Sequence, residues 1–118
     1  WVSKAGQLLE IGGVLAIALP NFGSLQRLIL QKNDPYICPP DHLNFFTPGS
    51  LKNLLKKNGF VVEKIQHVSR IPRSTIQKRM PRIASPLTPP LYFLVNMALR
   101  VVDLLGLGSI INVYATKV

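Results

Sequence analysis

Residues 14–19 form an apolar run, Val-Leu-Ala-Ile-Ala-Leu, in which apolar and polar positions do not alternate. A strand with helices on both faces has such a run, because neither face meets water. Pro20 follows directly and cannot donate to a strand ladder, so we expect the strand to end there. So short a segment cannot make a core alone, and it therefore predicts further strands beside it.

Two short helical segments flank this strand. Residues 3–10 are typical of the end of a helix, which Gly12-Gly13 would terminate because glycine tolerates positive φ. After the strand, Ser24 is suited to cap a short helix. Its apolar residues would share one face: Leu25, Leu28 and Ile29.

A third helix is predicted from residue 48 to residue 57. Thr47 and Pro48 are typical of an N-cap and a first helical turn, and Asn58-Gly59 of a helix end. The buried stripe would consist of the leucines Leu51, Leu54 and Leu55. The solvent face would consist of the lysines Lys52, Lys56 and Lys57. Residues 60–68 alternate loosely and predict a second strand, with His67 near its end.

Residues 69–108 predict an irregular basic excursion followed by a helix. Residues 69–90 contain five prolines, Pro90 included, which argue against regular structure there. Apolar residues then recur at helical spacing: Leu91, Leu94, Val95, Ala98, Val102 and Leu105. Charges within residues 91–111 would be costly in lipid, so we expect a core helix rather than a membrane span. Residues 110–116 alternate and predict a last strand.

The size and composition fit one domain over residues 1–118. A chain of 118 residues, of which 47% are hydrophobic, can bury about two-thirds of its unfolded surface. Because the first residue is Trp1 and the sequence opens on the end of a helix, we expect a fragment of a longer protein. Cys38 is the single cysteine and cannot form an intramolecular disulfide, so a reducing cytoplasm is the expected location.

The net charge is +9, and no acidic residue interrupts residues 64–82. This run contains Lys64, Arg70, Arg73, Lys78, Arg79 and Arg82. An acidic membrane surface, nucleic acid or a phosphorylated substrate would each bind such a run through counterion release. Aromatic residues are not interleaved with the charges, which makes nucleic acid the weaker candidate. The run predicts a place at the membrane periphery, and its plain alternative is a solvated face.

Three blocks resemble class I S-adenosylmethionine-dependent methyltransferases of the ubiquinone-biosynthesis-like group. Residues 9–21, LEIGGVLAIALPN, are similar to the segment that leads into the fifth strand. Residues 40–47, PDHLNFFT, with Ser50-Leu51, Leu54-Leu55 and residues 59–62, GFVV, are similar to the following loop, helix and sixth strand. Residues 110–117 resemble the seventh strand.

The resemblance implies an α/β fold, the C-terminal portion of a Rossmann-like sheet comprising the fifth, sixth and seventh strands with flanking helices. The seventh strand of that family inserts antiparallel between the other two, so we expect residues 110–116 beside 14–19 and 60–68. The cofactor of the parent protein would be S-adenosylmethionine. Its glycine-rich loop and ribose-binding acid belong to earlier strands, so no cofactor-binding residue is predicted here. Gly106-Leu107-Gly108 follows a helix and precedes a strand, which is the reverse setting.

His42 is the predicted catalytic base, because its loop should face the carboxyl ends of the strands, where open α/β sheets bind ligands. The alternative is a loop histidine that orders the Pro39-Pro40 turn through backbone hydrogen bonds. Cys38, Asp41 and His42 lie close in sequence, but their spacing does not match zinc sites, and no metal is predicted.

Four residues are predicted to bind substrate: Asn21, Phe22, Tyr36 and Phe45. Asn21 would lie at the mouth of the first strand, where the alternative role is a turn former. The aromatic residues, with Phe46, would wall an apolar acceptor pocket. Packing between helix and sheet explains Phe45 or Phe46 equally well, and one of that pair is expected in the core.

The leading functional hypothesis is a methyltransferase fragment that acts on a small or lipid-linked acceptor and is inactive alone. The alternative is a basic module that binds nucleic acid or acidic membranes without catalysis, and a third is an interaction segment without activity. Residues 14–19 would leave an apolar sheet edge exposed, from which self-association is expected.

Overall fold

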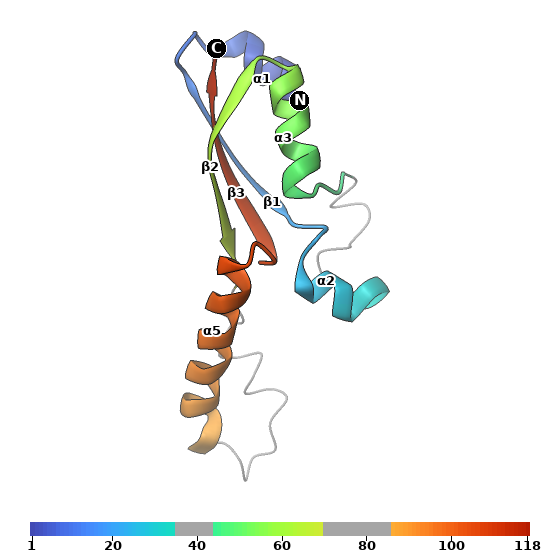
Figure 1. The fold of residues 1–118 in the computed structure, drawn as a ribbon, viewed down its shortest axis with the longest axis vertical. Coiled ribbons are helices and arrows are strands. Elements are labelled where there is room, and N and C mark those ends of the chain that lie inside the picture. Colours follow the sequence, from blue (N-terminus) through green and yellow to red (C-terminus); the bar gives the residue numbers. More distant parts are fainter. Residues whose placement is uncertain (35–43, 70–85) are drawn as a thin grey trace.

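The fold is mixed α and β, with an antiparallel sheet of three strands (Figure 1). The computed structural model describes residues 1–34, 44–69 and 86–118. The elements in chain order are α1 (Val2–Leu8), β1 (Val14–Pro20), α2 (Leu25–Leu30), the 3₁₀ turn η1 (Gln31–Asn33), α3 (Pro48–Lys57), β2 (Phe60–Val68), α5 (Thr88–Leu104) and β3 (Ile110–Lys117).

The C-terminal strand lies in the middle of the sheet. The strand order is β1-β3-β2, and β3 is antiparallel to both neighbours. Val113 pairs with Ile17 on one side and with Ile65 on the other. Because both outer strands oppose β3, they run parallel to each other, one strand apart. The expected arrangement of residues 14–19, 60–68 and 110–116 is therefore confirmed.

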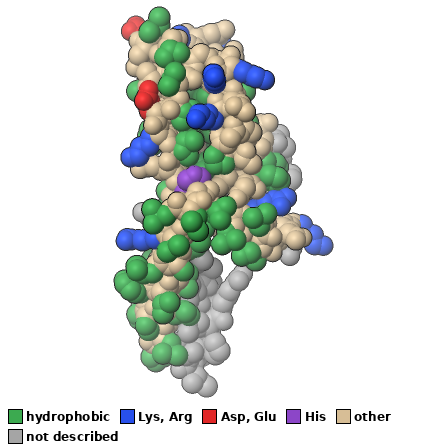
Figure 2. Space-filling model, in the orientation of Figure 1, with side chains coloured by type: hydrophobic (Ala, Val, Ile, Leu, Met, Phe, Trp, Pro, Cys, Tyr) green, Lys and Arg blue, Asp and Glu red, His purple; other side chains and the backbone are tan. Residues whose placement is uncertain are grey.

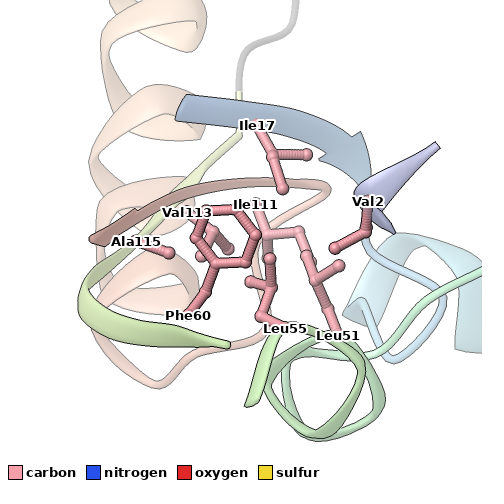
Figure 3. Packing of buried hydrophobic residues seen from close by; sticks show 8 residues of the cluster. All are labelled: Val2, Ile17, Leu51, Leu55, Phe60, Ile111, Val113 and Ala115. Carbon is pink, nitrogen blue, oxygen red and sulfur yellow. The ribbon is translucent and has the colours of Figure 1, made fainter. Parts of the chain in front are cut away.

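The core lies between this sheet and α3. Alternate residues of β3 point into it and are almost completely buried: Ile111, Val113 and Ala115. Figure 3 shows Leu51 and Leu55 of α3 facing these side chains, with Phe60 of β2 beside them. Burial of a large aliphatic or aromatic side chain contributes about 1.5–3 kcal/mol, so this small cluster dominates the stability of the fold.

The ends of α3 follow from its sequence as predicted. The Thr47 hydroxyl accepts from the Ser50 backbone N–H at 3.2 Å, and the Ser50 hydroxyl accepts from the Thr47 N–H at 2.9 Å, which makes a capping box. At the other end Asn58 donates to the Leu54 carbonyl, and Gly59 adopts φ 78°. Backbone groups at both helix ends thus find hydrogen-bond partners nearby in the sequence, and the leucine stripe of the helix faces the core.

The prediction that residues 14–19 are covered on both faces is wrong for the described chain. Ile17 is buried, but Val14 is 61% exposed and the alanines on the same face of β1 are also exposed. In the described residues α1 and α3 reach only the Ile17 face of the sheet, as the position of Val2 and Leu51 in the core shows. An apolar run shows that a strand can be packed on both faces. Whether helices pack on one face or on both is decided by the tertiary structure.

The prediction of a core helix within residues 91–111 is also wrong. The helix is present as α5, but it extends away from the end of the sheet, and Thr88 is its single buried residue (Figure 1). Leu94 is 68% exposed and Leu105 is 69% exposed. Helical spacing determines which residues share a face, but not whether another element packs on that face. No helix in the described residues has the length and apolar character to cross a bilayer.

Leu55→Ala tests the role of the α3 stripe in stability. Leu55 is 0% exposed, so truncation should leave a cavity and lower the free energy of unfolding by about 3 kcal/mol in urea denaturation. Leu94→Ala is the matched control, because its side chain is mostly exposed and should change stability by less than about 0.5 kcal/mol. Equal losses in the two variants would contradict the assigned core.

Candidate functional site

The ends of all three strands meet at one end of the sheet. Pro20, the last residue of β1, and Val68, the last residue of β2, both pair with Ile110, the first residue of β3. The next residues, Asn21 and Ser69, therefore lie at the carboxyl ends of the two outer strands. Open α/β sheets bind ligands at this end of their parallel strands, which makes it the first place to look for a site.

Asn21 connects the end of β1 to the residues that precede β3. Its side chain is 3% exposed, and its amide donates to the Gly108 carbonyl at 2.9 Å and accepts from the Gly23 backbone N–H at 3.0 Å. Its backbone N–H donates to the Ser109 carbonyl at 2.8 Å. The turn-forming role accounts for these contacts. A contact with substrate stays a prediction.

The predicted aromatic residues Phe22 and Phe45 lie against each other. Their ring centroids are 5.3 Å apart with an angle of 39° between the planes, and the Arg27 guanidinium lies 4.3 Å from the Phe22 centroid. Phe46 is half-buried against the core and accepts at its carbonyl from the Phe22 N–H at 2.9 Å. One of the phenylalanine pair thus packs on the core, as predicted.

The catalytic candidate His42 and the substrate candidate Tyr36 lie outside the described residues. The possible metal ligands Cys38 and Asp41 lie there as well. In the described ranges no three His, Cys, Asp or Glu side chains are grouped so that they could hold a metal ion.

An apolar cleft of about 230 Å³ opens between α2 and α5 beside these strand ends. Its walls are largely aliphatic and its polar side chains are two serines and a glutamine: Leu25, Gln26, Ile29, Leu30, Ser69, Leu99, Val102, Leu107 and Ser109. Such a cleft suits an apolar molecule that carries a polar group at one end. Sequence patterns did not predict it, because its walls come from segments far apart in the chain.

The polar side chains of the cleft are held by one another. The Ser69 hydroxyl accepts from the Ser109 N–H at 3.0 Å, and the Ser109 hydroxyl donates to the Gln26 side-chain oxygen at 3.1 Å. Gln26 in turn donates to Asp34 at 3.0 Å. This chain of bonds fixes the orientation of each group before any ligand arrives, which lowers the entropic cost of binding.

A second feature missed by sequence reasoning lies where α5 meets β2. One carboxylate oxygen of Asp103 accepts from the Ser69 N–H at 3.0 Å. The other oxygen and Nδ1 of His67 are buried and have no hydrogen-bond partner among the described residues. Both residues line an open cavity of about 590 Å³, together with Arg100. Unpaired buried polar atoms are costly, so this cavity is a second candidate for binding a polar group.

Gly108 allows this junction to close. A Cβ there would clash with the free carboxylate oxygen of Asp103 and would lie 2.9 Å from the His67 Cβ and 3.1 Å from the Val68 nitrogen. No residue with a side chain fits without displacing one of these neighbours. The glycine of Gly106-Leu107-Gly108 nearest the last strand therefore serves close packing between α5 and the end of β2.

Comparison with known protein families and with curated proteins found no match to this chain.

Gly108→Ala should disturb the strand ends through this clash. We expect the free energy of unfolding to fall by about 2 kcal/mol, as overpacked sites usually show. Gly49→Ala is the matched control, since nothing lies within 4 Å of its added Cβ and the helical position favours alanine. Thermal unfolding followed by circular dichroism compares the two variants. Equal melting temperatures would show that the junction of α5 with β2 accommodates a methyl group at residue 108.

Proposed function

We propose that this chain forms the acceptor-side part of an S-adenosylmethionine-dependent methyltransferase. The observation that carries the proposal is the strand order, in which β3 lies antiparallel between two strands that are parallel to each other. Strands that follow each other in a chain are usually neighbours in the sheet, yet β1 and β2 are separated by the last strand. The class I methyltransferases, which three blocks of this sequence resemble, use this same uncommon order.

The chemistry of methyl transfer explains what the described residues would do. The acceptor atom must be held in line with the sulfonium methyl group, and water must be kept away from it. The cleft between α2 and α5 lies at the correct end of the sheet and has aliphatic walls, with Ser69 and Ser109 as polar contacts. These features favour an acceptor with an apolar body, either a small molecule or a lipid-linked one.

The described residues do not fit the cofactor. Methyltransferases of this class hold S-adenosylmethionine at a glycine-rich turn that leads from a strand into a helix. Here β1 leads through Asn21-Phe22-Gly23 to the Ser24 cap of α2, and Gly106-Leu107-Gly108 leads from a helix into a strand. No step through the cofactor is therefore assigned to these residues, and their proposed part is to bind and orient the acceptor.

The 118 residues alone should not bind S-adenosylmethionine with micromolar affinity. A cofactor of this size needs a preformed cleft that buries most of its surface, and the described residues contain no matching turn. Isothermal titration of the purified chain measures this directly. Micromolar binding that disappears in Asn21→Ala would show that a cofactor site exists here and is built differently from that of the family.

The proposed activity is tested with the full-length product of the gene. We expect transfer of tritium from methyl-labelled S-adenosylmethionine to a compound in a small-molecule or lipid extract. Ile29→Trp should fill the cleft and lower kcat/KM for the acceptor by about tenfold or more, with KM for the cofactor unchanged. Leu28→Trp is the matched control, because Leu28 is exposed on the same helix but does not line the cleft.

Two results would overturn the proposal. One is a full-length product that neither binds S-adenosylmethionine nor transfers its methyl group to any fraction. The other is activity that Ile29→Trp and Leu28→Trp affect equally, which would remove the cleft from the acceptor site.

A further inference from the structure

The outward face of α5 is apolar along its whole length. At about 100° per residue, its exposed apolar side chains cover an arc of about 160°. The large ones, with those of the two cap residues Leu87 and Leu105, are between 40% and 87% exposed: Leu87, Leu91, Phe93, Leu94, Met97, Val101, Leu104 and Leu105. Figure 2 shows hydrophobic side chains gathered over this helix. A continuous apolar surface of this kind on a small protein marks an interaction site.

The polar side chains of α5 lie on the opposite, half-buried side. Asp103 accepts from the Ser69 N–H, and Asn96 donates to the Tyr92 carbonyl at 2.8 Å. A helix on a water-exposed surface normally has the reverse arrangement, with its polar side outward. Because Asp103 is held by its contact with the end of β2, α5 cannot rotate to hide the apolar face without losing that bond.

The charge of the chain indicates what covers this face. The net charge is +9, and the acid-free run of residues 64–82 precedes α5 in the sequence. A second copy of the chain would carry the same net charge of +9, which opposes close association of two copies. A bilayer that contains anionic lipids offers both an apolar interior and a negative surface, so it matches the two properties together.

The length and composition of α5 favour a position in the plane of the bilayer. The helix has 17 residues and does not meet the requirements for crossing a membrane. It has no charged residue before Arg100, which lies at the border of the exposed apolar arc. From there its guanidinium can reach lipid headgroups while its stem stays against the apolar face.

We propose that α5 docks this protein on an anionic membrane, with the helix lying in the surface and its outward apolar face among the upper acyl chains. This inference rests on the exposure of α5 and the charge of the chain, and it does not depend on the proposed methyltransferase activity.

Co-sedimentation with lipid vesicles tests this docking. The 118-residue chain should bind vesicles of equimolar phosphatidylcholine and phosphatidylserine, and should bind pure phosphatidylcholine at least about tenfold more weakly. The double substitution Leu94→Asp and Met97→Asp should reduce binding to the anionic vesicles by at least about tenfold, because each places a charge in the lipid. Leu8→Asp is the matched control, since Leu8 is 78% exposed on α1, and it should leave binding unchanged. Circular dichroism confirms that all variants fold alike.

A fluorescent probe separates insertion from simple attraction of charge. An environment-sensitive dye at Met97→Cys, in a Cys38→Ser background, should shift to the blue on anionic vesicles and be quenched by brominated acyl chains. Vesicle binding that the double variant does not weaken, or a probe that stays in water, would overturn the proposal. So would a stable wild-type dimer in analytical ultracentrifugation that the double variant converts to a monomer, because a second copy would then be the occupant.

Discussion

The fold depends on the position of β3 between β1 and β2. This strand pairs with β1 along residues 110–116 and with β2 along residues 110–117, and its alternate side chains are among the most deeply buried of the described residues. The outer strands do not pair with each other, so the sheet does not exist until the last segment of the chain is in place. Both ladders join residues far apart in sequence, and such pairings carry a large loop-closure cost. The core that Leu51 and Leu55 of α3 form with Phe60 and the buried side chains of β3 must offset that cost.

The candidate site is a consequence of the same pairing. The register of β3 brings Asn21, Ser69 and Ser109 to one end of the sheet, although they lie up to 88 positions apart, the distance in sequence from Asn21 to Ser109. Asn21 then binds the Gly108 carbonyl and Ser69 binds the Ser109 N–H, so the polar groups hold the strand ends while lining or adjoining the cleft. A shift of register by one residue would turn Ile111 and Val113 to the other face and separate these contacts, because strand side chains alternate. Stability and site geometry are therefore coupled through one strand.

The junction of α5 with β2 links the site to the proposed membrane surface. Asp103 bonds the Ser69 N–H, and Ser69 lines the apolar cleft on the other side. The half-buried face of α5, with Leu99 and Val102, forms part of that cleft, whereas its opposite face is exposed. If α5 lies in a bilayer surface, the cleft is next to the lipid. A lipid-linked acceptor held at the membrane surface would then be close to the cleft, so the two proposals are compatible.

The sequence alone determined the local elements, whereas the place of the last strand at the centre of the sheet was expected only from the resemblance. Thr47, Pro48 and Gly59 mark the bounds of α3 because capping and positive φ are properties of a few neighbouring residues, and the alternation of residues 110–116 fixes which face of β3 is buried. It also predicted that Asn21 would lie at the end of the sheet, since it directly follows a strand. Only the tertiary structure decided the rest. It left one face of β1 and the outward face of α5 exposed, and it brought Gln26, Ser69 and Leu99 into one cleft and His67 and Asp103 into another. Periodicity states which residues share a face, but the neighbour of that face comes from distant parts of the chain and is set by pairing and packing.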